Sequence, residues 1–600
     1  MDKNTFTGLF LIMIVLAGSF YFISPNETEI KKEKERITAD SLKKAGASTA
    51  PAPAAAVTAL PAIDSTALKG PFGGNISGTE QTSVLENERL KLTFTNKGGK
   101  ILSVEVKGQE TYEGKPVVLF NGNQNKFGLI LSAAGKRIST NDLYFTASKT
   151  ANSIQMRADY GANQFVEYVY DLQPNSNNVG FNINLNGLNQ VIQNNSVMLN
   201  WEATLLEQEK SSVKEREHSS PYYKYLNQNP DHLSVAKDEK LELNEGKIEW
   251  ISFKQHFFSA VLIPGSGFDK GNLEVVSSTK PGEIKWYGAN MELPYNHLAA
   301  QNYAMKFYFG TNKFSVLKEQ GHEIEKQVDM GYWPLKYINR FVVLPVFNFL
   351  EGFGWGYGLI ILVLTILLKV AMSPLTYKSY ISMAKMRILK PEMDEIKAKV
   401  GEDNPTLLQQ EYLKLYKQVG VNPLGGCLPM LLQLPFVMAF FFFFPNLFEL
   451  RGESFLWMKD LSTYDDFIKF GFTIPFIGDH LSLMCVLMTI STLIYTYFNN
   501  QISGATGQMK YIGYIMPVVF LGVLNSYPSG LNYYYFLANM LTFGQQFLIK
   551  KMVDDKKIHA TLLENKTKPV EQKKKSKFQQ RLDDYMRQQQ QQAAQQKKTK

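Results

Sequence analysis

One charged side chain, Lys369, lies inside a long apolar stretch, and its position raises the first chemical question about this sequence. A lysine at the centre of a bilayer costs about 2.5–3.5 kcal/mol on insertion scales, so the charge requires a compensating interaction. Lys369 lies about one helical turn before Ser373 and Pro374, so its stem could carry the ammonium group to the lipid headgroups. A polar cavity inside the protein is the alternative explanation.

Polar side chains on the neighbouring apolar stretches favour the cavity. In the last stretch they recur at steps of three and four residues and share an arc of about 80° on a helix. The members of this row are Asn532, Tyr535, Asn539, Thr542 and Gln546. A second row consists of Thr489, Thr492, Thr496 and Asn499. Hydrogen bonding between helices would explain each row alone, whereas several rows around an unpaired cation indicate a hydrated cavity.

The apolar stretches contain no Asp or Glu that could pair with Lys369. Proton-coupled transporters and ion pumps bind their cation with a carboxylate inside the membrane, so the sequence disfavours that class. A lone lysine favours transient binding of a negatively charged group, such as the tail of a polypeptide that passes through the cavity. The predicted substrate groove consists of Lys369, Thr365, Gln433, Thr492, Asn499, Tyr535, Asn539 and Thr542. A small-solute transporter that uses the same cavity is the second hypothesis.

The rest of the chain offers no catalytic or metal-binding pattern. The four histidines between residues 200 and 300 lack the spacing of a metal site, and neither G-x-S-x-G nor a P-loop occurs. The two cysteines, Cys427 and Cys485, lie in or beside apolar stretches, which excludes a disulfide framework and a thiolate zinc site. We therefore predict no catalytic residue, no metal and no cofactor, in a protein that is not an enzyme.

The net charge of +9 could indicate a nucleic-acid-binding protein, but the excess lies in one segment. Residues 550–600 contain fifteen Lys or Arg and six Asp or Glu, which also gives +9. A basic flank on the cytoplasmic side of a membrane accounts for much of this charge. Attraction to ribosomal RNA phosphates is the functional alternative for this Gln-rich tail.

The elements that must position these polar rows are membrane helices. Five stretches have bilayer length and lie near residues 357–373, 424–444, 481–498, 511–525 and 531–549. Residues 1–25 supply a sixth, since the exit Phe20-Tyr21-Phe22 lacks the small residues that cleavage of a signal peptide requires. The connector 374–423 carries eight Lys or Arg, whereas 445–480 carries three against six acids. Both termini are therefore predicted in the cytoplasm and the large domain outside it.

The segment between the first two predicted spans has a different pattern. A charged and then Ala/Pro/Thr-rich linker occupies residues 26–75. Residues 76–330 show strand periodicity in runs such as Leu90–Phe94, Phe181–Leu185 and Met305–Phe309, and then a helical connector at 314–330. Many short strands separated by turn residues predict a β-sandwich. Residues 331–356 mix polar and apolar side chains and predict an amphipathic helix at the membrane interface.

The basic connector is predicted to form a cytoplasmic helical hairpin over residues 377–420. Apolar residues at helical spacing run from Met386 to Val400 and again from Leu408 to Val419. The breaker residues of Gly401-Glu-Asp-Asn-Pro405 separate the two halves. The fold class is thus an α-helical polytopic membrane protein with six spans, five of them in a C-terminal core of residues 357–549, plus an extracytoplasmic β-sandwich.

Several motifs in the C-terminal part resemble the YidC/Oxa/Alb family of membrane protein insertases, in the form found in bacteria with two membranes. They are Ser373-Pro-Leu-Thr376, Ser382-Met-Ala-Lys-Met-Arg387, Leu415-Tyr-Lys417, Asn422-Pro-Leu-Gly-Gly-Cys427-Leu-Pro429, Gln433-Leu-Pro435 and Tyr527-Pro-Ser-Gly-Leu531. The resemblance covers about residues 333–549 and is specific, because the motifs occur in order with the expected spans between them. Residues 250–258 resemble the family's periplasmic domain more loosely.

The resemblance implies an insertase and chaperone in the bacterial inner membrane, whose groove opens to the cytoplasm and to lipid. It implies nascent membrane proteins, the Sec translocon and lipids as partners, and a mutarotase-like periplasmic β-sandwich without catalytic duty. Met383, Met386 and Arg387 belong to the predicted cytoplasmic hairpin. The groove cation of well-known members is Arg, and this chain has Lys369 at the matching position. Because lysine lacks the bidentate geometry of arginine, we expect diffuse attraction of a substrate carboxylate.

Overall fold

The computed structural model describes residues 72–133, 135–401, 405–421, 428–503 and 508–567. These residues form two compact units. The β unit ends at Asp329 and also includes Asn446–Gly452, and the helical unit comprises Met330–Pro445 and the residues from Glu453 onward. The predicted anchor (1–25), nearly all of the linker (26–75), Cys427 and the end of the tail lie outside the described residues.

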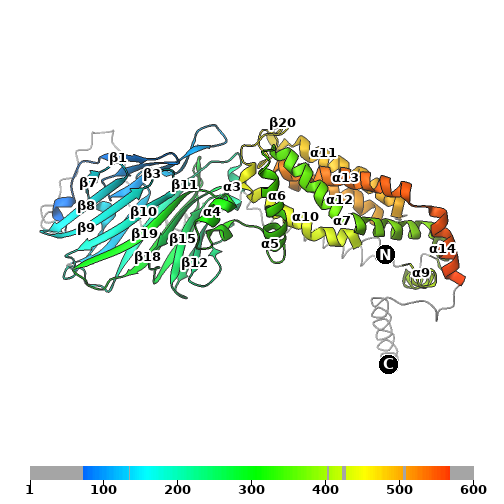
Figure 1. Ribbon diagram of the computed structural model, residues 1–600, viewed down its shortest axis with the longest axis horizontal. Coiled ribbons are helices and arrows are strands. Elements are labelled where there is room, and N and C mark those ends of the chain that lie inside the picture. The colour runs from blue at the N-terminus through cyan, green and yellow to red at the C-terminus, as the bar shows by residue number, and fades with distance from the viewer. Residues whose placement is uncertain (1–71, 134, 402–404, 422–427, 504–507, 568–600) are drawn as a thin grey trace, which may run out of the picture. The chain divides into compact units, whose positions relative to one another are not determined.

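Two large antiparallel sheets form the β unit (Figure 1). The nine-stranded sheet has the order β13 (Asp231–His232), β12 (Ser220–Tyr225), β15 (Ile248–Lys254), β16 (Phe258–Pro264), β19 (Ala300–Thr311), β10 (Asn178–Asn186), β9 (Gln164–Leu172), β8 (Ser153–Gly161) and β7 (Thr146–Lys149). The six-stranded sheet has the order β14 (Glu239–Leu243), β17 (Lys270–Ser277), β18 (Glu283–Pro294), β11 (Ser196–Leu206), β5 (Lys126–Ala133) and β6 (Lys136–Ser139). A four-stranded sheet contains β1 (Thr82–Glu86), β2 (Leu90–Thr95), β3 (Lys100–Glu110) and β4 (Pro116–Asn121).

The core of the β unit follows from the alternation of its strands. Successive side chains of a strand point to opposite faces, so an alternating sequence gives one apolar face. In β10, Val179, Phe181, Ile183 and Leu185 are buried and the residues between them are half-buried. The ring of Phe181 meets that of Phe127 on β5 with centroids 5.2 Å apart, so the two large sheets share one core. The strands predicted around residues 90–94, 181–185 and 305–309 are confirmed.

The helices of the β unit are short. They are α3 (Ser212–Glu217), α4 (Phe314–Glu319) and the 3₁₀ turns η1 (Gly73–Asn75), η2 (Thr140–Asp142), η3 (Ile324–Gln327) and η6 (Phe448–Leu450). The predicted helical connector over 314–330 is therefore wrong beyond Glu319. Gly321, His322 and Glu323 have positive φ angles of 74°, 55° and 60°, a conformation that cannot continue a right-handed helix.

Five long helices run side by side in the helical unit (Figure 1). They are α7 (Tyr357–Ile388), α10 (Leu428–Asn446), α11 (Leu483–Ser503), α12 (Gln508–Leu524) and α13 (Ser529–Met552). Each coincides with one predicted span, within a few residues at most ends. Among the described residues, only α7 is both long and apolar enough to cross a bilayer by composition, and Gln433–Asn446 and Tyr511–Leu524 are shorter apolar helices. Six spans are thus not confirmed.

Helix α7 continues through Pro374, beyond the predicted end of its span. A proline inside a helix leaves the carbonyl four residues earlier without its amide partner. The hydroxyl of Ser373 donates a 2.8 Å hydrogen bond to that carbonyl, on Val370. The helix ends instead at Ile388, and α8 (Lys390–Val400) begins with Pro391 in its first turn. Gly401, with a φ of 79°, ends α8 before α9 (Pro405–Val419), as the breaker residues predict.

The predicted interfacial helix consists of α5 (Leu335–Ile338), the π-helical turn η4 (Asn339–Val343) and α6 (Leu344–Glu351). Its inner face includes the fully buried Asn339, whose amide donates to the carbonyl oxygens of Met330 and Ala439. Its outer face exposes Phe341 and Phe349. Two further elements complete the unit: the hairpin β20 (Ile468–Ile474) and β21 (Gly478–Leu481), and the helix α14 (Asp555–Thr567).

Candidate functional site

Lys369 is buried between α7 and α13. Its ammonium group donates a 2.7 Å hydrogen bond to the hydroxyl of Thr542, and only 8% of the residue is exposed. The Thr542 hydroxyl in turn donates to the carbonyl of Ala538, 2.6 Å away. Gln545, one turn further along α13, donates a 3.0 Å hydrogen bond to the backbone carbonyl of Lys369. The lysine is therefore held by α13 and does not extend to the end of its helix.

A second contact joins α13 to α11. The side-chain amide of Asn539 donates to the hydroxyls of Ser491 and Thr492, at 3.0 and 2.8 Å. Asn539 lies one turn before Thr542, so the two contacts are adjacent on α13. We call Lys369, Thr542, Gln545, Asn539, Ser491 and Thr492 the polar cluster. It joins three helices, and the residues in contact lie between 47 and 176 positions apart in the sequence.

The other predicted groove residues lie around this cluster. Thr365 is fully buried one turn before Lys369 and donates to the carbonyl of Ile361 in its own helix. Tyr535 is directed to α10, where its hydroxyl lies 3.4 Å from the carbonyl of Val437. Gln433 and Asn499 are half-buried, and no hydrogen bond in the described part of the chain joins either to the cluster. The structure thus brings together four of the eight predicted residues.

Buried amide groups near the cluster lack partners within the described residues. They are the Oδ1 atom of Asn532, the Oε1 atoms of Gln545 and Gln546, and the Nδ2 atom of Asn500. A buried polar group without a partner costs about 1–3 kcal/mol, so such atoms are normally satisfied by water or a ligand. This part of the bundle can therefore accept hydrogen bonds from, and donate them to, a polar guest. The cluster itself consists of hydroxyl, amide and ammonium groups.

The sequence patterns did not predict two members of the polar cluster, Ser491 and Gln545, for different reasons. Ser491 is adjacent to Thr492, and a row built on steps of three and four residues selects only one of two neighbours. Gln545 contacts the main chain of Lys369, and side-chain periodicity contains no information about backbone acceptors. Gln546, which belongs to the predicted row, is buried but has an unpaired oxygen atom.

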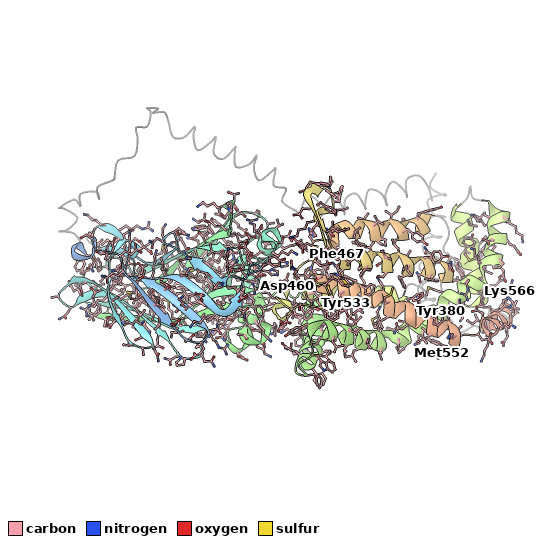
Figure 2. The ribbon with its side chains drawn as sticks, turned by 90° about the horizontal axis from the view of Figure 1, so that it is seen from above. Tyr380, Asp460, Phe467, Tyr533, Met552 and Lys566 are labelled. Carbon is pink, nitrogen blue, oxygen red and sulfur yellow. The ribbon has the colours of Figure 1, made fainter. Side chains whose placement is uncertain are left out.

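A network of buried polar groups closes one end of the helical unit. The carboxylate of Asp465 accepts hydrogen bonds from the Ser482 hydroxyl and from the backbone N–H of Met484, at the start of α11. Asn525, just after α12, accepts from the Ser482 N–H at 2.9 Å, and Ser529 at the start of α13 donates to the Asp460 carbonyl at 3.0 Å. Asp460 and Tyr533 lie at this end in Figure 2, and Met552 and Lys566 at the opposite end. The polar cluster lies between these ends.

The three hairpin residues lie on the last turns of α7. Met383 is buried, and Met386 packs against an apolar cluster formed by the ends of α7, α8, α9 and α14. Arg387 forms a 2.7 Å ion pair with Asp555 of α14.

No group of three His, Cys, Asp or Glu side chains in the described ranges has the geometry of a metal site. His218 stacks on His256 with centroids 4.4 Å apart, and His297 lies 3.0 Å from the Asn195 oxygen. These contacts are structural interactions of the β unit.

A bundle of apolar helices that contains a buried cation and buried amides, in a chain that also forms a β-sandwich, is typical of a membrane protein with a domain outside the bilayer. Family models agree: "60Kd inner membrane protein" matches residues 349–557, and "YidC periplasmic domain" matches residues 82–344. The membrane protein insertase YidC of Bacteroides fragilis is 37% identical over 604 residues, with 97% of each chain covered. That of Parabacteroides distasonis is 36% identical over 620 residues, again with 97% of each covered. The chain belongs to the YidC family of membrane protein insertases, which are not enzymes, and hence to the bacterial inner membrane.

Solved structures show more distant similarity. A crystal structure of an active YidC insertase with its first transmembrane domain resolved is 17% identical, with a TM-score of 0.34, over 78% of this chain and 92% of that one. A galactose mutarotase-related enzyme from Lactobacillus acidophilus is 9% identical, with a TM-score of 0.26, over 38% of this chain and 97% of that one. Because both TM-scores are low, the family assignment rests on the sequence relatives.

Proposed function

We propose that the polar cluster is the substrate-contacting part of an insertase and chaperone that receives hydrophobic segments from the cytoplasm and releases them sideways into lipid. The observation that carries this proposal is a buried lysine that has no carboxylate partner among the described residues, beside amide atoms that have no partner there either. These groups replace water for the polar tail of a membrane protein in transit. The tail therefore crosses the bilayer without losing all of its hydrogen bonds.

The face of α7 opposite the cluster supports lateral release. Ile366, Leu367 and Val370 flank Lys369 in sequence and are exposed. An apolar segment gains as much contact with lipid tails as with such side chains, so no large free energy holds it on the protein. The substrate's polar part contacts the cluster while its apolar part moves along this surface into the bilayer.

The proposed topology places both termini in the cytoplasm and the β unit in the periplasm, with six spans. Its support is the distribution of basic residues between the connector 374–423 and the segment 445–480. In this topology the hairpin formed by α8 and α9 lies in the cytoplasm, where it meets an incoming chain. The basic tail lies there too and would contact ribosomal RNA, and the helical unit would work alone or beside the Sec translocon.

Photocrosslinking tests the cluster as the substrate path. A photoreactive amino acid at Thr365 or Asn539 should capture a ribosome-bound nascent membrane protein, because both positions are part of the polar cluster or one turn from it. The matched control positions are Val370 and Ile494, which are exposed on α7 and α11. Capture only at the control positions would overturn the proposed path. In a time course, capture at Asn539 before capture at Val370 would support the proposed order, in which the substrate contacts the polar cluster before it reaches the exposed surface of α7.

A further inference from the structure

The β20–β21 hairpin, between α10 and α11, exposes an unusual amount of apolar surface. Ile468, Phe472 and Phe476 are all exposed, Phe476 with 83% of its surface, and Phe467 precedes the first strand with 61%. Most side chains of β20 are exposed, whereas His480 of β21 is buried. A hairpin of two strands has little stability of its own in water. Its exposed rings therefore require an environment that is less polar than water.

The hairpin is nevertheless fixed firmly at its base and tip. Asn525 is fully buried and donates hydrogen bonds to the carbonyls of Ile477 and His480, at 2.8 and 2.7 Å. The carbonyl of Phe476 lies against Gly522 of α12, where a Cβ atom would be only 2.6 Å from the oxygen. The ring of His480 stacks on Tyr464 with centroids 3.8 Å apart. These contacts hold the exposed rings in one place.

Charge is distributed along the hairpin in a way that indicates its partner. Residues 470–478 contain no charged side chain and include three phenylalanines and two isoleucines. The charged groups are at the base, where Lys469 forms a 2.6 Å ion pair with Asp466 and Asp479 is exposed. A protein partner is usually specified by polar groups around an apolar centre, and the tip has none. Aromatic rings beyond a charged base are typical of an element in the membrane interface.

The neighbouring helix extends the same surface. Val518, Val519 and Phe520 of α12 are exposed shortly before Gly522, the residue on which the hairpin tip rests. Phe467 lies at the same end of the helical unit as Asp460 and Tyr533 (Figure 2). The apolar surface of α12, which faces lipid in an inner-membrane protein, is thus continuous with the hairpin.

The geometry points to the β20–β21 hairpin as a lipid-binding element whose phenylalanine rings enter the bilayer interface beside the end of α12. The occupant of its surface is the headgroup and upper acyl region of the adjacent leaflet. The hairpin sets the depth at which the closed end of the bundle sits in the membrane. This role does not depend on how the polar cluster handles substrates.

Fluorescence in proteoliposomes tests the proposal with the full chain. A Cys427→Ala, Cys485→Ala background receives Phe476→Cys, labelled with the environment-sensitive dye NBD. We expect blue-shifted emission and quenching by lipids that carry a spin label near the headgroup, about twofold stronger than for the same dye at Lys469→Cys. The Lys469 position is the matched control because it lies on the same hairpin with a mainly exposed side chain.

Equal quenching at the two positions, with water-like emission at Phe476→Cys, would overturn the proposal. Blue-shifted emission without quenching by labelled lipid would also overturn it, because a protein would then cover the surface. A second labelled position, Phe472→Cys, separates a local folding defect at the tip from loss of lipid contact. Nascent-chain capture at Asn539 in the same samples tests the proposed function separately.

Discussion

At the scale of single residues, Lys369 combines a fixed position with an unneutralised charge. Thr542 and the backbone contact from Gln545 hold it between two helices, and neither partner carries a negative charge. A lysine offers a compact charge that attracts a carboxylate without a fixed bidentate geometry. Such an attraction is strong enough to draw a substrate tail inward and weak enough to release it.

Lys369→Glu should therefore impair insertion of membrane proteins with acidic translocated tails more than those with neutral tails. Reversing the charge converts an attraction into a repulsion, and about 1–2 kcal/mol at an intermediate dielectric corresponds to roughly a tenfold loss for acidic clients. The measurement is the initial rate of insertion for a pair of clients that differ only in tail charge. Lys369→Arg is the control and should retain activity for both clients. Equal loss for acidic and neutral tails would remove charge attraction from the mechanism.

The buried Lys285 of the β unit leads to a separate prediction about how the free energy of unfolding depends on pH. Its side chain is fully buried and donates 2.8 Å hydrogen bonds to the carbonyls of Ser219 and Val235. Burial lowers the pKa of Lys285 from 10.5 to about 8. Between these values the unfolded chain binds more protons than the folded chain, so the free energy of unfolding should rise with pH.

Lys285→Met should flatten this rise, which we expect to be about 2–3 kcal/mol between pH 8 and 10.5. Urea unfolding of the full chain in detergent, followed by tryptophan fluorescence at several pH values, measures it. Lys280→Met, a change at an exposed side chain five residues away, should leave the slope unchanged. Burial also lowers the pKa values of Lys100 and Lys254 to about 8, so part of the rise should remain in Lys285→Met. A rise as steep as in the unmodified chain would assign the pH dependence to those other groups.

Residue patterns alone identified the cation Lys369 and the polar row of α13, because a single charge in an apolar stretch and a helical period can both be read directly from the sequence. These patterns did not predict which residues of the two polar rows contact each other. Tyr535 and Asn539 belong to the same predicted row, yet one is directed to α10 and the other to α11. The packing angles and positions of α10 and α11 around α13 determine that choice, and no local pattern contains them.

At the scale of elements, α14 changes the expected picture of the cytoplasmic hairpin. Sequence composition assigned residues 550–600 to a basic tail, but Asp555–Thr567 form a helix that packs on α7, α8 and α9. Leu562 is buried among Leu389, Leu415 and Val419, and Lys566 pairs with Glu392 at 3.1 Å. In the sequence, α14 alternates charged and apolar residues and resembles a solvated tail. Its few apolar side chains are buried only by residues that lie far away in the sequence.

Leu562→Ala should release α14 and raise amide hydrogen exchange in α9. Removing a buried leucine side chain costs at least about 2 kcal/mol, more than the ion pairs at the rim contribute. Hydrogen exchange with mass spectrometry of the full chain in lipid nanodiscs measures the effect. Leu563→Ala is the matched control, because Leu563 is the next residue and is exposed. If both variants exchange alike, then α14 does not restrain the hairpin.

At the scale of the whole molecule, the chain passes between the two compact units three times. It leaves the β unit after Asp329, returns for Asn446–Gly452 and leaves again before Glu453. The returning segment, which follows α10, packs Phe448 against the rings of Phe257 and Phe258. Sequence analysis placed it in a loop between spans, because its partners lie more than a hundred residues earlier in the chain.

Arg451 is the main polar contact of this segment. Its guanidinium forms a 2.7 Å ion pair with Glu209, donates to the Glu110 carbonyl at 2.8 Å and lies 4.9 Å from the centre of the Phe258 ring. Both charged side chains are nearly buried, with 7% and 12% exposure. Burial raises the pKa of the nearby Glu215 to about 8, and the charge of Glu209 adds to this rise.

Arg451→Ala should destabilise the β unit by up to about 3–5 kcal/mol, because it removes the ion-pair partner of the largely buried Glu209 carboxylate. Hydrogen exchange of the full chain should then increase in β16, which carries Phe258, and remain unchanged in α13. Adding Glu209→Gln should recover part of the loss, because it removes the buried carboxylate that Arg451 paired with, and a double-mutant cycle measures this coupling between the two sites. Lys459→Ala, at an exposed position further along the same loop, controls for nonspecific effects. Independent, additive losses at Arg451 and Glu209 would mean that the phenylalanine contacts alone hold the segment in place.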